Sequence, residues 1–169
     1  MHMKHCLALS LLGPLALASC SQPQRALEEK NKALVNRFGA AVNARDFDAV
    51  RQLLSPDFVR HSQASPSVSV ANADQFIDYL RADAAVFPDS RQTLEHIVAE
   101  GDLVAFWIRY EGTQDGQMGP FPPSHKRMRL DSGGLFRVRD GRLAELWVTW
   151  DNVAALSQLG YFPPPAARP

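Results

Sequence analysis

The chain has 169 residues, which is enough for one domain once a targeting segment is set aside. Its 18 basic residues balance 18 acidic residues, so no net charge attracts nucleic acid or an anionic membrane surface, and we expect no nucleic-acid partner. Apolar residues make up 46% of the sequence, which is the composition of a chain that folds around a core.

The first twenty residues have the pattern of an export signal. Lys4 precedes an apolar stretch, Cys6 to Ala18, that is too short to span a bilayer and has the length of a signal-peptide core. The residues Leu17-Ala18-Ser19-Cys20 resemble a bacterial lipobox. We therefore expect residues 1–19 to be a lipoprotein signal peptide, with an ordinary secretory signal and a retained anchor as the alternatives.

Under the lipoprotein interpretation, Cys20 carries the lipid and residues 20–25 form a polar tether. The protein would then be attached to a membrane of the cell envelope through its lipid and would face the periplasm. Ser21 after the cysteine favours the outer membrane in a Gram-negative organism. Because Cys6 is removed and Cys20 is acylated, no thiol is left for a disulfide, a metal site or nucleophilic catalysis.

The first half of the mature chain has helical periodicity. Apolar residues predict a long helix over residues 26–44, a second helix capped by Asp46 and a third helix over residues 72–86. Phe58 to His61 form a short extended segment after the second helix. Residues 63–71, rich in Ser, Ala and Val, are expected to form a loop or lid.

The second half has the alternation of β-strands. Four runs are expected to be strands: residues 93–99, 103–110, 126–138 and 143–150. Asp140-Gly141 predicts a tight hairpin turn, and Gly133-Gly134 inside a strand indicates a bulge or bend. Asp151 is placed to cap a short helix over residues 152–159. The domain is therefore expected over residues 26–160, followed by a disordered proline-rich tail over residues 161–169.

Helices first and antiparallel strands afterwards predict an α+β fold, with the helices on one face of a bent sheet. A bent sheet that is covered by helices encloses a pocket.

Several segments can be taken together in chain order: Asn31 to Val35, Ser55 to Val59 with His61, Phe87 to Asp89, Val98 to Asp102, Phe136 to Leu143, Glu145, Trp147, Trp150-Asp151 and Gln158 to Gly160. Together they resemble the SnoaL-like polyketide cyclase family, also called ester cyclases, within the nuclear transport factor 2-like superfamily. The resemblance covers about residues 30 to 160. It implies a cone of three to four helices on a strongly curved antiparallel sheet, and a homodimer.

Alternation along the last strand suggests where chemistry could occur. It places Glu145, Trp147 and Asp151 on one face, where two carboxylates among aromatic groups would suit a pocket wall. Desolvation there would raise the pKa of a carboxylic acid and suit it to proton transfer. The resemblance implies that Asp151 is the general acid/base of an intramolecular aldol condensation, which needs no metal or other cofactor.

Three further residues are candidates for this site. His61 would hydrogen-bond a substrate carbonyl or orient Asp151, Arg137 would stabilise an enolate, and Trp107 would line the substrate pocket together with Glu145 and Trp147. The expected ligand is a small, largely apolar carbonyl compound.

Structural roles for the same residues stay open. Asp151 is equally placed to be a helix cap, and Glu145 to pair with Arg129 or Arg137 across strands. The histidines form no short metal-ligand motif. An enzyme and a non-catalytic protein, one that binds a small ligand or dimerises in the envelope, therefore both remain possible functions.

Overall fold

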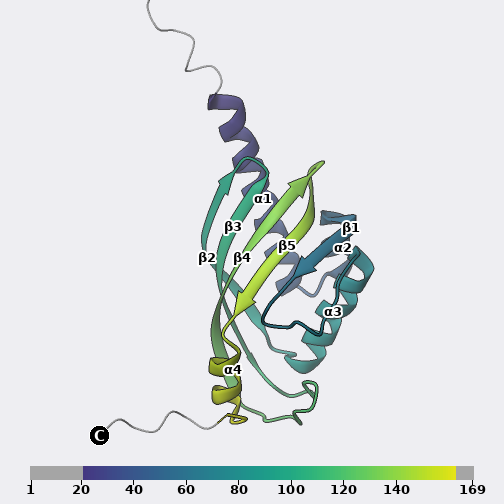
Figure 1. The fold of residues 1–169 in the computed structure, drawn as a ribbon, viewed down its shortest axis with the longest axis vertical. Helices are drawn as coiled ribbons and strands as arrows, with labels where there is room; N and C mark the ends of the chain where they lie inside the picture. The colour runs from purple at the N-terminus through teal and green to yellow at the C-terminus, as the bar shows by residue number, and fades with distance from the viewer. Residues whose placement is uncertain (1–20, 163–169) are drawn as a thin grey trace, which may run out of the picture.

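The structure is a computed structural model that describes residues 21–162. The chain first forms helices α1, α2 and α3 around strand β1, then a run of four strands, and last a short helix (Figure 1). The element bounds are α1 Ser21–Asn43, α2 Phe47–Leu53, β1 Leu54–His61, α3 Ala73–Val86, β2 Arg91–Glu100, β3 Leu103–Thr113, β4 Arg127–Arg139, β5 Arg142–Trp150 and α4 Asn152–Leu159. The predicted α+β class is confirmed, and each predicted helix and strand is present.

The five strands form one curved sheet in the order β1-β5-β4-β3-β2. Strands β2 to β5 follow one another as antiparallel hairpins, as predicted. Strand β1 instead pairs with β5 in parallel, so the sheet is mixed and the prediction of a wholly antiparallel sheet is wrong in this detail. Local sequence patterns predict no partner for the short extended segment, because its partner lies more than eighty residues further along the chain.

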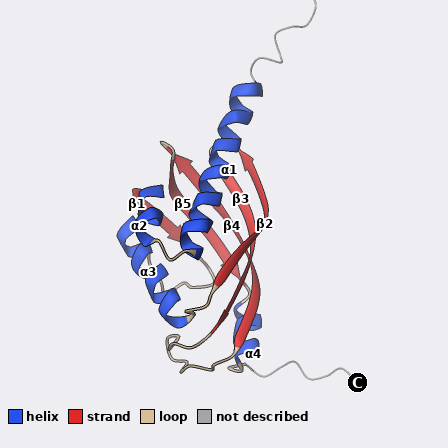
Figure 2. Ribbon diagram, turned by 180° about the vertical axis from the view of Figure 1, so that it is seen from behind, coloured by secondary structure: helices blue, strands red, loops and turns tan. Residues whose placement is uncertain are grey.

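Helices α1 and α3 cover one face of the sheet, which we call the inner face (Figure 2). Aromatic rings from helices and strands meet there: the ring centroid of Phe58 lies 4.7 Å from that of Phe76, and the ring of Phe38 lies 5.2 Å from that of Phe136. Within the described residues no helix covers the middle of the opposite face, which we call the outer face (Figures 1 and 2). Burial of these rings fixes the helices on the sheet.

The predicted ends of the domain differ from the structure. Residues 21–25, expected to form a tether, are the first turns of α1, which extends beyond the sheet in Figure 1. Tyr161 and Phe162, expected to belong to the disordered tail, are described and follow α4 directly. The signal peptide and Cys20 lie outside the described residues, so the lipid anchor and envelope location stay predictions, as does the homodimer. None of the helices in residues 21–162 is sufficiently long and apolar to span a membrane.

Two glycine predictions have different outcomes. Asp140 and Gly141 both have positive φ angles, 52° and 72°, which confirms the predicted tight hairpin turn. Gly133 and Gly134, however, pair without any shift in register, so of the two predicted alternatives, a bulge or a bend, the bulge is absent. The two glycines leave room for neighbouring aromatic rings. A Cβ on Gly133 would lie 2.8 Å from the ring of Trp107, and one on Gly134 would collide with the ring of Phe106. Aromatic rings of β3 thus lie across β4 on both faces.

Candidate functional site

A cavity of about 970 Å³ lies between the inner face of the sheet, helices α1 and α3, and two loops. The loops come from residues 64–68 and 117–121, so the loop expected to act as a lid does line the cavity. Helix α4 closes one end of the cavity with Ala155 and Leu156. Most of the wall is apolar, which is the usual character of a site for a small organic ligand.

A carboxyl group and a phenol form the first polar feature of this cavity. Asp83, near the end of α3, lies in the cavity wall together with Tyr110 of β3. The Tyr110 hydroxyl donates a hydrogen bond to Asp83 Oδ2 at 3.0 Å. Asp83 Oδ1 has no hydrogen-bond partner among residues 21–162 and is therefore free to act on a ligand.

Burial changes the acidity of these groups. Burial among apolar groups raises the pKa of Asp83 above its ordinary value, although the Tyr110 hydrogen bond and the charges of Arg45 and Arg60 act in the opposite direction. Burial also raises the pKa of Tyr110, and the neighbouring Asp83 charge adds to the effect. Tyr110 therefore remains a hydrogen-bond donor, while Asp83 is the group of the pair whose acidity is shifted toward the protonated carboxylic acid.

A buried guanidinium group is the second polar feature. Arg60 projects inward from β1 and is only 5% exposed. Its Nη2 donates to Ser65 Oγ at 3.0 Å and makes a longer contact of 3.4 Å with the Tyr79 hydroxyl. The rings of Tyr79 and Trp150 lie 4.5 Å and 5.7 Å from its Cζ atom, so aromatic faces surround the cation.

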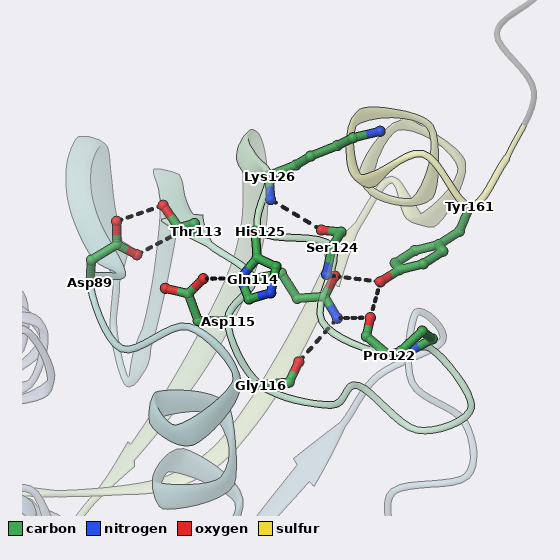
Figure 3. Close-up of polar contacts among 10 residues, drawn as sticks. All are labelled: Asp89, Thr113, Gln114, Asp115, Gly116, Pro122, Ser124, His125, Lys126 and Tyr161. Carbon is green, nitrogen blue, oxygen red and sulfur yellow. Dashed lines mark hydrogen bonds and ion pairs between the residues drawn. The ribbon is translucent and has the colours of Figure 1, made fainter.

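One buried glutamine holds the loop that covers the cavity (Figure 3). Gln114 is fully buried, and its Nε2 donates to the backbone carbonyls of Gly116 and Pro122 at 3.1 and 3.0 Å. Its Oε1 accepts hydrogen bonds from the Ser124 amide and the Tyr161 hydroxyl at 3.2 and 2.8 Å. The side chain thus satisfies the backbone of the loop between β3 and β4 and ties the C-terminal segment to it.

Gln114→Ala is expected to lower the free energy of unfolding by about 2–3 kcal/mol, because it leaves several buried loop groups without partners. Urea denaturation monitored by tryptophan fluorescence would measure this loss. Gln117→Ala is the matched control, since Gln117 lies in the same loop, is exposed and bonds only Gly119. Equal stability of the two variants would contradict the anchoring role of Gln114.

Four of the residues that the sequence singled out do meet, but on the outer face. His61 Nε2 lies 2.8 Å from Glu145 Oε1, and Arg137 Nε donates to Glu145 Oε2 at 3.3 Å. The His61 ring stacks on Trp147 with a centroid distance of 5.2 Å. The cross-strand pairing of Glu145 with Arg137, given as the alternative, is confirmed.

Arg137, Glu145, Trp147 and Trp107, which are predicted to line the substrate pocket, do not lie in the wall of the inner cavity. On β5 the cavity is lined by the opposite set of residues, Leu146, Val148 and Trp150. The helices pack on the uniformly apolar face of the strand, since only that face can be buried without leaving charges in the core.

Asp151 also lies away from the cavity. It is exposed, and its Oδ1 accepts a hydrogen bond from the Ala154 amide at 2.9 Å, so the helix-cap role is confirmed. Together with Trp107 it borders a shallow, open hollow of about 660 Å³ on the outer side of β3, β4 and β5. The structure therefore does not bring Asp151 and His61 to the inner cavity. Within residues 21–162 no group of three or more His, Cys, Asp or Glu side chains could hold a metal ion.

The structure has the nuclear transport factor 2-like fold, in which four helices pack on a curved five-stranded sheet. A family model described as SnoaL-like polyketide cyclase matches residues 32–159. The chain therefore belongs to the SnoaL-like polyketide cyclase family.

Several solved structures are similar to this chain. IdmH of Streptomyces antibioticus, a proposed polyketide cyclase, is 30% identical, with a TM-score of 0.68 over 77% of this chain and 98% of that one. AclR of Streptomyces galilaeus, a proposed hydroxylase, is 28% identical, with a TM-score of 0.71 over 81% and 85%. A proposed SnoaL-like polyketide cyclase of Jannaschia sp. CCS1 is 26% identical, with a TM-score of 0.73 over 82% and 96%. A search of curated proteins found no match.

Proposed function

We propose that the protein binds a small, largely apolar carbonyl compound in its inner cavity and performs acid/base chemistry on it through Asp83. The observation that carries this proposal is the position of Asp83: its side chain lines the cavity, and one carboxyl oxygen accepts a hydrogen bond from Tyr110 while the other has no partner among the described residues. The apolar wall would bind most of the ligand, and the carboxyl group would act on its polar part.

The proposed chemistry needs no cofactor. Ionised Asp83 would accept a proton from the carbon next to a carbonyl group at Oδ1, and protonated Asp83 would return a proton to the new alkoxide or to carbon. The Tyr110 hydrogen bond to Oδ2 fixes the direction of Oδ1 in both forms. Burial raises the pKa of Asp83 and so makes its carboxylate a stronger base than an exposed aspartate.

This proposal gives Asp83 the role that the sequence assigned to Asp151. Asp151 is exposed and is used as a helix cap, whereas Asp83 lies within the largely apolar cavity. The family match and the 30% identity to a proposed polyketide cyclase support a carbonyl compound as the substrate class.

The test begins with whatever small molecule copurifies with the protein. Native mass spectrometry of the wild type is expected to show a bound molecule that carries a carbonyl group. Ile108→Trp, which adds a large ring inside the cavity, should lose that molecule. Thr149→Trp is the control, since Thr149 is exposed on the outer face of β5. Retention of the molecule by Ile108→Trp with loss from Thr149→Trp would place the ligand site outside and overturn the proposal.

A further inference from the structure

Arg60 forms no direct ion pair with an acidic residue in the described part of the chain. Its Nη1 atom is buried and makes no hydrogen bond, while Nη2 is used by Ser65 and Tyr79. Asp83 is the one acidic residue among those that line the cavity; its charge interacts with that of Arg60, but its hydrogen bond is with Tyr110. The Arg60 side chain, which is 5% exposed and lines the cavity, therefore keeps Nη1 without a hydrogen-bond partner.

A buried arginine without an anion in direct contact is costly for the protein. A guanidinium group stays protonated at all accessible pH values, so Arg60 cannot avoid the cost by losing its proton, as a lysine could. The rings of Tyr79 and Trp150 compensate part of the lost hydration through cation–π contacts. They offer no lone pair to Nη1, however, and the two N–H groups of that atom remain unsatisfied.

We propose that the ligand of the inner cavity is an apolar carboxylate whose oxygens accept hydrogen bonds from Arg60 Nη1. The inference rests on the proposed function, because it names the second polar group of the same ligand. A carboxylate matches the donors of a guanidinium group and would neutralise the buried charge. The largely apolar wall requires that the remainder of the ligand be mostly hydrocarbon or aromatic.

The surroundings of Arg60 hold it ready for such a ligand. Its backbone is paired on both sides, with Leu146 of β5 and with Val70 of the following loop. The Ser65 hydroxyl holds Nη2, so rotation of the guanidinium plane is restricted. Preorganisation of this kind lowers the entropy cost of binding a charged group.

The test compares two probes that differ only in charge. At pH 7.5, 6-phenylhexanoate is expected to bind the wild-type protein about 10–100-fold more tightly than the neutral 6-phenylhexanamide, the range expected for hydrogen bonds to a charged group. Quenching of Trp150, whose ring lies 5.7 Å from Arg60 Cζ, would report binding. Isothermal titration calorimetry would provide a second measurement that does not depend on fluorescence.

Two variants assign the preference to the arginine. Arg60→Met keeps the apolar stem and removes the charge, so the two probes should then bind with equal affinity. Arg129→Met is the matched control, because Arg129 is exposed on the outer face of the same sheet, and it should retain the full preference. If Arg60→Met does not fold, the affinities of the two probes are compared in the wild type and in Arg60→Lys instead. Arg60→Lys should retain part of the preference for the carboxylate.

The outcomes separate this inference from the function on which it rests. Equal binding of both probes to the wild type, or an unchanged preference in Arg60→Met, would overturn the carboxylate proposal and leave the cavity as a ligand site. If neither probe binds, and their shorter and longer homologues do not bind either, both proposals are overturned. A preference for the carboxylate that disappears only in the arginine variant supports both.

Discussion

Asp83→Asn is expected to reduce the turnover number of the identified substrate by about 10²–10⁴-fold, the usual contribution of a general acid or base. The amide keeps the size of the carboxyl group and can still accept the hydrogen bond from Tyr110, but it cannot exchange a proton. The Michaelis constant should change little, because the apolar wall that we propose binds the substrate is intact. Steady-state kinetics on the molecule identified by mass spectrometry would measure both parameters.

Asp151→Asn provides the contrasting case. Asparagine caps a helix about as well as aspartate, so this variant should keep both its stability and its turnover number. Asp131→Asn, at an exposed position of β4, is the control for a change of surface charge. Loss of turnover in Asp151→Asn with normal turnover in Asp83→Asn would refute the assignment to Asp83 and return the catalytic role to the outer face.

Asp83→Asn should also change how the stability of the protein depends on pH. Burial raises the pKa of Asp83 in the folded state, so over the range between its unfolded and folded pKa values the folded protein holds a proton that the unfolded chain has lost. This contribution to stability is complete below the unfolded pKa and is lost as the pH rises through the folded pKa. The free energy of unfolding of Asp83→Asn, relative to the wild type, should therefore increase with pH above about 4 and then become constant.

Phe58→Ala is expected to lower the free energy of unfolding by about 3–5 kcal/mol, which is a large part of the total stability of a domain of this size. Phe58 is 0% exposed, and its ring packs 4.7 Å from Phe76 of α3, so truncation removes the contact between β1 and that helix and leaves a hole. Phe58 does not line the inner cavity, which means that the loss would arise from packing alone. Urea denaturation would provide the value.

The control for this truncation is Phe162→Ala. Phe162 is 46% exposed, so its loss should change the free energy of unfolding by less than about 0.5 kcal/mol. A similar small effect for Phe58→Ala would mean that β1 and α3 are not held by this contact.

Periodicity predicted the elements of this fold well because their apolar residues are regularly spaced. Asp46 and Asp151 cap the helices that follow them, and each accepts a hydrogen bond from an amide three residues later. Such signals are local, and they need no knowledge of the rest of the chain. The partner of β1 is not a local property, which is why its parallel pairing with β5 was missed.

The site predicted from the sequence lies on the face of β5 opposite the inner cavity, for a physical reason. The alternation along β5 predicts that the mixed face with Glu145 and Trp147 is a pocket wall and that the apolar face is plain packing. In the structure the apolar face serves both purposes, because the cavity is continuous with the core and its wall is itself apolar. The polar groups of the cavity come from other elements.

The spacing of the polar cavity residues relative to core residues could have revealed them in the sequence. Arg60 follows the buried Phe58 by two residues in a strand, and Tyr110 follows Phe106 by four, so both share the phase of core residues. Asp83 lies seven residues after Phe76 in α3, on the same side of that helix. A polar residue whose spacing places it among core residues is a more direct indication of a cavity than a polar face of a strand.

The parallel pairing of β1 with β5 sets the order in which the molecule can assemble. Residues 54–61 must wait until residues 142–150 have left the ribosome before they find their neighbours, and Arg60 is among them. The hairpins β2 to β5 join segments that are close in sequence and can form early, whereas the edge contributed by β1 closes last, because distant segments meet slowly. The inner cavity is thus expected to be completed late in the folding of the newly synthesised chain.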